Sequence, residues 1–226
     1  MKDTDEWLVP ASHSLESLKR IQEDIASKVV VKDDLNTPAT IAGTDCAFSG
    51  NSIICVAVLL DYRTMDVIER AHVVQKLDFP YIPTYLSFRE GKATASAISG
   101  LNRRPDIVMF DGCGINHPRK VGLASHIGVV LDIPTIGIAK KILCGNADDP
   151  ELDEAKPLIF KNEQIGWLMK TTKRSNPIVI APGHRVSMET CLKITRHCLA
   201  GYKLPEPTRL AHLYANEIKK ELMENE

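Results

Sequence analysis

Three acidic residues occupy positions where a carboxylate needs an explanation. Asp45 lies inside one apolar segment, Asp111 closes another, and Glu90 stands early in a predicted helix. A buried carboxylate is costly unless a partner compensates its charge. Carboxylate oxygens with no Cys or His ligand pattern beside them suit Mg²⁺, which shares phosphate oxygens with its substrate. A converging set of this kind predicts metal-assisted hydrolysis of a phosphodiester.

Each of these acids also has an ordinary structural explanation when it is taken alone. Asp45 can point outward from an alternating strand, and Asp111 can form the turn after its strand. Glu90 can stabilise the start of its helix by its interaction with the helix dipole. Spacing along the chain does not show that the three converge. Both interpretations therefore stay open at this point.

Aromatic side chains gather in one short stretch, although they make up only 5% of the chain. Four of them fall within ten positions: Phe79, Tyr81, Tyr85 and Phe88. Pro80 and Pro83 enclose Tyr81 and Ile82, and proline on both sides keeps this pair out of a helix or a central strand. A rigid, projecting aromatic and aliphatic pair is suited to opening a base stack. The alternative is a proline turn that packs its tyrosine on the surface.

Basic and histidine residues follow the predicted strand ends. The turn at 114–120 is polar and basic and leads into a helix, where phosphate groups bind readily. Lys140 ends the next apolar strand, at the edge where Asp111 is expected. The remaining candidates for contacts to phosphate or to metal-bound water are His117, Arg119, His184, Arg185 and His212. Taken singly, each of these residues also has an ordinary structural explanation.

The first half of the chain predicts a sheet that changes character along its length. An amphipathic helix is expected over 14–29, because its apolar residues recur at helical spacing. Strands are expected over three segments joined by short turns, as in an antiparallel meander: 39–48, 52–60 and 67–74. The pattern then alternates helix and wholly apolar strand, which is typical of buried parallel sheet: helix 84–99, strand 107–110, helix 121–131 and strand 135–139.

The second half predicts fewer elements. Residues 146–163 are locally acidic and are expected to form an exposed connection. A hairpin over 165–169 and 178–181 precedes a helix from Ser187, and the last helix is expected to start near Thr208 and to carry His212 in its first turns. The expected fold class is α/β, with a mixed central sheet flanked by helices. Residues 1–226 are expected to form a single domain.

Charge and cysteine usage exclude several classes of protein. The 28 basic and 29 acidic residues give a net charge of −1, which excludes a uniformly basic protein that coats nucleic acid. The charge is not evenly spread, because residues 170–203 hold seven basic residues and one acidic residue. No apolar run approaches the roughly 20 residues of a membrane-spanning helix, and the acidic segment 1–6 lacks the features of a signal peptide. A cytoplasmic protein is expected. Its six cysteines show no zinc spacing, and neither structural zinc nor disulfides are expected.

Seven ordered blocks carry a resemblance to a known family. They are IAGTD at 41–45, FPYIP at 79–83 with LSFRE at 86–90, DGCGINHPR at 111–119, GLASH at 122–126, PTIGIAK at 134–140, PGHR at 182–185, and LPEPTRLAH at 204–212. With these blocks the chain strongly resembles the endonuclease V family of nucleic-acid repair enzymes, across nearly its full length. The resemblance implies a ribonuclease H-like fold, in agreement with the predicted meander and βαβα pattern.

The resemblance also implies an activity. It is Mg²⁺-dependent hydrolysis, with Mn²⁺ able to substitute, of the second phosphodiester bond 3′ to a deaminated base, chiefly inosine. The products would be a 3′-hydroxyl and a 5′-phosphate. The implied partner is DNA that contains deoxyinosine, with inosine-containing RNA as an alternative, and the protein would act as a monomer away from membranes.

Roles follow for residues that match the family's motifs. Asp45, Glu90 and Asp111 correspond to the metal-binding carboxylates, Lys140 to the active-site lysine, and His212 to the histidine near metal-bound water or the scissile phosphate. The segment Pro80-Tyr81-Ile82-Pro83 corresponds to a wedge that separates the strands, with Tyr81 filling the place of the extruded base. The base pocket is expected around Leu86, Gly112, Gly114, Leu123 and Leu143.

Two cysteines depart from the family's pattern. Cys46 follows the first aspartate where valine is common, and Cys113 occupies the variable position between Gly112 and Gly114. Neither departure removes a ligand. Cys113 beside the pocket predicts an activity that is sensitive to oxidation.

Other functions stay open on the sequence. A junction-selective nuclease is disfavoured by the predicted wedge, but the wedge does not separate DNA from RNA, because that choice depends on tolerance of a 2′-hydroxyl. A non-catalytic binder of damaged ends is disfavoured because Asp45, Glu90, Asp111 and His212 are all retained. A nucleotide-binding protein that uses 111–114 as a phosphate loop lacks the third glycine and the downstream Lys-Ser/Thr.

Overall fold

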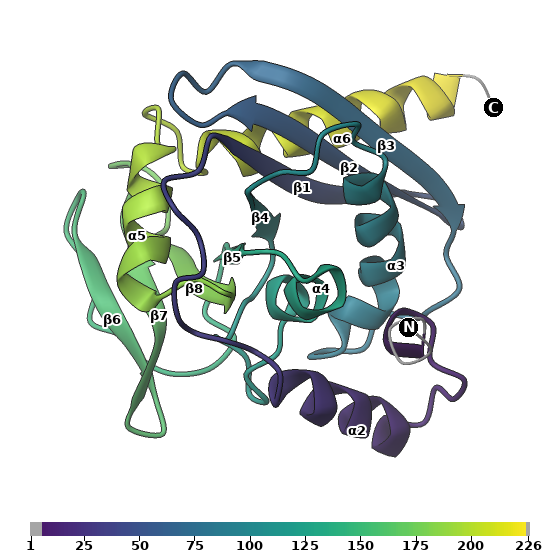
Figure 1. Cartoon of the computed structure of the whole chain (residues 1–226), viewed down its shortest axis with the longest axis horizontal. Coiled ribbons are helices and arrows are strands. Elements are labelled where there is room, and N and C mark those ends of the chain that lie inside the picture. The colour runs from purple at the N-terminus through teal and green to yellow at the C-terminus, as the bar shows by residue number, and fades with distance from the viewer. Residues whose placement is uncertain (1–5, 225–226) are drawn as a thin grey trace.

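An eight-stranded mixed sheet runs through the computed structural model, which describes residues 6–224 (Figure 1). The strand order is β3-β2-β1-β4-β5-β8-β7-β6. The strands are β1 (Thr40–Ser49), β2 (Ser52–Asp61), β3 (Val67–Lys76), β4 (Ile107–Asp111), β5 (Thr135–Ala139), β6 (Ala155–Phe160), β7 (Glu163–Met169) and β8 (Ile178–His184). β1 to β3 form an antiparallel meander, and β4 and β5 run parallel to β1. The predicted mixed sheet, with a meander followed by βαβα, is confirmed.

Helices cover both faces of the sheet (Figure 1). α3 (Leu86–Ser99) and α4 (Leu123–Leu131) share one apolar core with it, and α5 (Met188–His197) and α6 (Glu206–Glu224) share another on the opposite face. α2 (Leu15–Ala26) packs outside α4, on a cluster that includes Phe79, Tyr85 and Phe88. Within residues 6–224 no helix combines the length and the apolar character needed to cross a membrane. Residues 1–5, which carry most of the acidic N-terminal segment, lie outside the described part.

Burial explains why the inner strands could be predicted. Every residue of β5 is buried, as is every residue of β4 before Asp111, so both strands had to be apolar apart from Thr135, whose hydroxyl donates to the carbonyl of Ala124. β3 lies at the edge of the sheet, and its residues alternate between exposed and partly buried positions. The wholly apolar pattern therefore marks the strands at the centre, and these are the strands that position the site.

Among the differences from the predicted elements, three have a clear physical reason. The acidic segment 146–163 is not simply an exposed connection, because β6 lies within it and pairs with β7 around the fully buried Leu158. α6 begins at Glu206 rather than near Thr208, whose hydroxyl donates to the carbonyl of Pro205 in the first turn. α3 begins at Leu86 rather than at 84, because Thr84 has a φ of 69° and cannot belong to a right-handed helix.

A disulfide joins Cys46 to Cys55, and the expectation that no cysteine pairs is wrong for these two residues. They are direct partners across β1 and β2, with Cα atoms 4.2 Å apart, a separation at which antiparallel strands bring side chains together. The other four cysteines, Cys113, Cys144, Cys191 and Cys198, are free. The disulfide stands beside Asp45, and it ties β2 to the strand that carries this carboxylate.

His126 is a fully buried ionisable residue on α4. Its Nε2 donates to the carbonyl of Trp7 at 2.9 Å, and its ring meets Phe88 edge to face. Its Nδ1 has no hydrogen-bond partner among the described residues. Burial lowers the pKa of His126 to about 4, because the charged ring would lose its hydration.

We expect this residue to make the fold sensitive to mild acid. Between pH 6.5 and 4 the unfolded chain protonates His126 while the folded chain does not, so the free energy of unfolding falls as the pH falls through this window. The expected loss from this residue is about 2 kcal/mol between pH 7 and pH 5. Urea denaturation at both pH values should show a smaller difference for His126→Gln, which keeps a donor to Trp7. His13→Gln, at an exposed position, is the control, and an unchanged pH dependence in His126→Gln would contradict the prediction.

Candidate active site

Strand register brings Asp45 and Asp111 to the same edge of the sheet. β1 and β4 are parallel neighbours in which Thr44 lies opposite Phe110, so the two aspartates are the next residues of adjacent strands. Neighbouring strands are spaced by about 4.8 Å. This edge is formed by the carboxyl ends of β4 and β5, where open α/β sheets place their sites, and Asp45 reaches it from the middle of β1, just beyond the part that pairs with β4.

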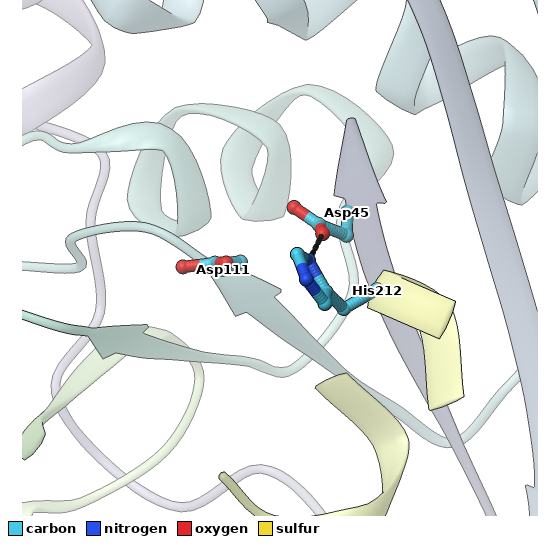
Figure 2. Close-up of side chains that lie close together, drawn as sticks. All are labelled: Asp45, Asp111 and His212. Carbon is cyan, nitrogen blue, oxygen red and sulfur yellow. Dashed lines mark hydrogen bonds and ion pairs between the residues drawn. The ribbon is translucent and has the colours of Figure 1, made fainter. Parts of the chain in front are cut away.

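A close contact between α6 and β1 brings His212 to the same place. A Cβ on Gly43 would lie 1.9 Å from the carbonyl oxygen of Pro207, so the first turn of α6 rests directly on the backbone of β1. His212 follows five residues after Pro207, and its Nδ1 donates to Oδ2 of Asp45 at 2.7 Å (Figure 2). The side-chain amide of Asn216, one turn further along, lies 3.2 Å from Nε2 of His212 and fixes the ring from its other side.

Asp45, Asp111 and His212 together form a candidate metal-binding group. Each offers one ligand atom, and these atoms all lie within 4.8 Å of one another. They come from β1, from the end of β4 and from α6, and Figure 2 shows Asp45 and His212 joined beside Asp111. The two carboxylates are ligands that hard divalent cations prefer, whereas imidazole is more typical of transition metals such as zinc. The predicted convergence of Asp45 and Asp111 is therefore present.

Glu90 lies on α3 near this group but outside the set within 4.8 Å. Its burial, followed by the negative charges of Asp45 and Asp111, raises the pKa of Glu90 to about 8, although Arg89 acts in the opposite direction. Burial and the charge of Asp111 likewise raise the pKa of Asp45, against the hydrogen bond from His212. A divalent cation bound here would reduce the repulsion between these three carboxylates. The crowding thus fits a metal site.

Lys140 supplies a positive charge at the same edge. Asp111 lies opposite Ile138 in the sheet, and Lys140 follows two residues later, where its ammonium forms an ion pair with Oδ2 of Asp111. Burial alone would lower the pKa of Lys140, but the charge of Asp111 and the hydrogen bond to it outweigh burial and raise this pKa. Lys140 therefore stays charged at neutral pH.

The proline-flanked segment presents one projecting aromatic side chain. Tyr81 is 67% exposed, which agrees with the predicted wedge. Ile82 differs from the expectation of a projecting pair, because it is partly buried and packs on the cluster that contains Phe79 and Tyr85. Pro80 and Pro83 are exposed on either side. Tyr81 is thus the member of this segment that is free to enter a base stack.

The residues expected to form the base pocket are only partly brought together. Gly112 lies against Leu123, whose side chain a Cβ on Gly112 would approach to 3.3 Å. Gly114 is buried, and a Cβ there would lie 2.1 Å from the carbonyl oxygen of Pro182. Leu86 is partly buried at the start of α3, whereas Leu143 is exposed beyond the end of β5. Gly112 and Leu123 are therefore the pair that the structure places in contact.

The four residues expected to contact phosphate have other partners. His117 and Arg119 lie on the loop after β4, but their side chains turn to Thr84. His184 is buried opposite Thr135, the first residue of β5, and so lies at the far edge of the sheet from Asp111. Arg185 forms ion pairs with Asp34 and Asp132. The antiparallel direction of β8 explains the position of His184 and Arg185, because its carboxyl end lies beside the amino end of β5.

Sequence reasoning missed three polar residues near the site: Gln22, Thr84 and Asn216. Asn216 carried a signal, since it stands four residues after His212 on a predicted helix and shares its face. Gln22 carried another, because it interrupts the apolar face of α2 and is fully buried between Leu18 and Ile25. Nothing in the local sequence marks Thr84, because its partners lie far away along the chain.

Comparisons with known proteins agree with the geometry. A family model described as Endonuclease V matches residues 23–213. An endonuclease V of Protochlamydia amoebophila is 41% identical over 218 residues, which cover 92% of this chain and 92% of that protein. The crystal structure of endonuclease V from Streptomyces avermitilis has a TM-score of 0.88 and 30% identity, covering 95% of this chain and 96% of the other.

A further solved structure shows a similar fold. It is endonuclease V from Ciona intestinalis in complex with a 24mer DNA that contains an inosine followed by a ribo-adenosine. The TM-score is 0.84 at 24% identity, covering 93% of this chain and all of that chain. At this identity the likeness concerns the fold.

Proposed function

The chain belongs to the endonuclease V family of DNA repair endonucleases, and from that premise we propose that it hydrolyses the second phosphodiester bond 3′ to a deaminated base, chiefly deoxyinosine, with the help of Mg²⁺. The observation that carries the proposal is the pair of aspartates at neighbouring positions of two adjacent parallel strands, with His212 bonded to one of them and Lys140 to the other. The inosine-containing DNA bound by the Ciona intestinalis protein supports the choice of base. We propose that residues 1–226 act as one nuclease domain.

Asp45, Asp111 and Glu90 would hold the metal ion. Burial, followed by the repulsion between neighbouring carboxylates, raises the pKa values of Asp45 and Glu90, which supports a site built for positive charge. When bound, Mg²⁺ supplies Lewis-acid stabilisation of the phosphate and of the attacking and leaving oxygens. Mn²⁺ would serve in the same place, since it accepts the same oxygen-rich donor set.

His212 and Lys140 would act on the reacting groups directly. In the hydrolysis the oxygen of water bonds to phosphorus, the bond from phosphorus to the 3′ oxygen breaks, and that oxygen takes up a proton. His212 is held at this edge by Asp45 and Asn216 while its ring stays exposed, so it can hold a proton there. The ammonium of Lys140 would contact a non-bridging phosphate oxygen.

Selectivity would come from a base taken out of its stack. Tyr81 would occupy the vacated place in the stack, and the extruded base would be received near Gly112 and Leu123. An inosine pair is weak, so opening it costs less than opening a normal pair. The same parts would serve an inosine-containing RNA strand, which differs by its 2′-hydroxyl groups.

A side-by-side cleavage assay tests the proposed function. The substrates are single- and double-stranded DNA and RNA of one sequence, each with a single inosine, together with matched strands that carry guanine. We expect a nick one nucleotide beyond deoxyinosine on the lesion strand, with a 3′-hydroxyl end, in Mg²⁺ or Mn²⁺ and not in EDTA. Cleavage that ignores inosine, or intact lesion duplex, would refute the proposal, and faster cleavage of RNA would select the ribonuclease alternative.

A further inference from the structure

Thr84 stands directly after the wedge segment 80–83 in a strained conformation. Its φ of 69° is in the left-handed region, which a β-branched residue rarely enters. Such a conformation is strained and persists only where the surroundings hold it. The contacts of Thr84 therefore indicate what fixes the end of the wedge.

Three side chains converge on the carbonyl oxygen of Thr84. Gln22 donates to it from α2 at 2.8 Å, His117 at 3.0 Å and Arg119 at 3.1 Å. Arg119 also donates to the hydroxyl of Thr84 at 2.6 Å, and through its Nε to the side-chain oxygen of Gln22 at 2.6 Å. Gln22 is fully buried and His117 nearly so. We call Gln22, His117 and Arg119 the Thr84 clamp.

The hydrogen-bond directions within the Thr84 clamp are consistent with one another. Nδ1 of His117 accepts the backbone N–H of Arg119 at 3.2 Å, which leaves its Nε2 to carry the hydrogen and donate to Thr84. Burial, followed by the charge of Arg119, lowers the pKa of His117 to about 4, so the ring is neutral at pH 7. A buried neutral histidine is a poor partner for a phosphate, and its place is in the clamp.

The other end of the wedge is anchored as well. Arg89 donates to the carbonyl of Phe79 at 2.8 Å, and its guanidinium lies over the ring of Phe48, 4.7 Å from the centroid. The guanidinium of Arg119 lies in a similar way over Tyr85, at 4.6 Å. Tyr81 thus projects from a short segment that is fixed on both sides.

His117 and Arg119 belong to the loop that begins at Asp111 and contains the glycines of the expected base pocket. We propose that Gln22, His117 and Arg119 are positioning residues, which hold the wedge in register with the base pocket so that strand opening and base capture occur in one rigid unit. This inference rests on the proposed function. In it Arg119 acts through Thr84 and Tyr81 rather than by binding a phosphate of the substrate.

The inference predicts a loss confined to duplex substrates. A single strand has no partner to displace, so it does not need a fixed wedge. Gln22→Met removes both hydrogen bonds of a buried, uncharged residue while it keeps the length of the side chain. We expect its kcat/KM to fall by about tenfold to a hundredfold on deoxyinosine duplex, since a shift of about 1 Å at a remote support can cost a hundredfold. On the single strand we expect less than about a threefold change.

Three further variants separate positioning from phosphate binding and from loss of stability. Arg119→Lys keeps the charge but loses the planar fork, so positioning predicts the same duplex-selective loss, with an unchanged salt dependence of binding. If Arg119 instead contacts a phosphate, removing its charge in Arg119→Gln should lower affinity equally for both substrates. The slope of the logarithm of the binding constant against the logarithm of the salt concentration should then be smaller by about one. Thr195→Val removes a buried hydrogen bond of α5 far from the wedge and is the control for stability.

Hydrogen exchange supplies a readout that does not depend on cleavage. The amide of Tyr85, which donates to the carbonyl of Ile82, should exchange faster in Gln22→Met than in the wild type. Arg119→Lys, which loses the planar fork that bonds Thr84, gives the same test if Gln22→Met does not fold. Equal losses on duplex and single strand, or unchanged exchange at 79–86, would overturn the inference. Wild-type protein that cleaves neither inosine substrate would refute the proposed function instead, while the exchange result still decides whether the clamp fixes the wedge.

Discussion

Asp45→Asn is expected to lower cleavage of deoxyinosine duplex by about a thousandfold or more while leaving the metal-free protein folded. A metal ion contributes several kcal/mol to the transition state of phosphodiester hydrolysis, and each 1.4 kcal/mol corresponds to a factor of ten in rate. The side-chain oxygen of the new asparagine would still accept the N–H of Cys46, which the wild-type carboxylate accepts at 2.9 Å. The variant therefore loses a charge at the edge of the sheet and, because an amide nitrogen replaces Oδ2, the oxygen that accepts from Nδ1 of His212.

Asp45→Asn is expected to lower activity without lowering the stability of the metal-free protein. In the metal-free protein, Asp45 adds to the repulsion that raises the pKa of Glu90, so removing its charge should leave the melting temperature unchanged or raise it. Mg²⁺ or Mn²⁺ should raise the melting temperature of the wild type, because a ligand that binds only the folded state stabilises it by mass action. In Asp45→Asn this increase should shrink.

The measurements are thermal melts with and without divalent cation, next to single-turnover cleavage. Asp148→Asn removes an exposed carboxylate from the acidic segment 146–163 and is the matched control. It should keep both the cleavage rate and the metal-dependent stabilisation. Full activity in Asp45→Asn, or a metal-dependent stabilisation equal to that of the wild type, would rule out the assignment of Asp45 as a metal-holding residue.

The positions of Asp111 and Lys140 could be predicted from sequence because they depend on strand ends. A wholly apolar run that closes on Asp111 marks a central strand and its carboxyl end, and the same holds for the run that ends at Lys140. Parallel strands bring such ends to a common edge. The partnership of Asp45 with His212 needed one further fact, the close approach of α6 at Gly43, which depends on a tertiary contact.

The disulfide shows why register is harder to predict than strand identity. The hairpin between β1 and β2 was expected, yet pairing Cys46 with Cys55 requires the turn to place Ser49 opposite Ser52. A slip of one residue would set Cys46 opposite another residue and turn it to a different face. β6 was missed for another reason, because acidic residues surround it and only Leu158 is fully buried.

The Thr84 clamp could not be predicted because its members are far apart in the chain. Gln22 and Arg119 lie 62 and 35 residues from Thr84 and belong to different elements. His117 and Arg119 looked like phosphate contacts because basic side chains before a helix often are. In three dimensions both side chains form hydrogen bonds to Thr84.

Tyr81→Ala is expected to weaken binding to deoxyinosine duplex by about 10- to 100-fold, with a much smaller effect on the inosine-containing single strand. Stacking of a base on an aromatic side chain is worth about 1–3 kcal/mol by alanine substitution. Tyr81 is 67% exposed, so its removal leaves no cavity in the core. Fluorescence anisotropy in EDTA measures binding without cleavage, and Tyr81→Phe, which keeps the ring, should bind like the wild type.

A double-mutant cycle connects Tyr81 to the Thr84 clamp. If Gln22 acts only by holding the wedge, Gln22→Met has nothing left to misplace once the ring of Tyr81 is gone. The double variant should then bind duplex no more weakly than Tyr81→Ala alone, whereas independent roles predict that the two losses add. Equal weakening of duplex and single-strand binding by Tyr81→Ala would contradict the wedge. Additive losses would show that the Thr84 clamp does not act through Tyr81. If it does act through Tyr81, its effect must pass along the short segment between Phe79 and Thr84, which is anchored at both ends.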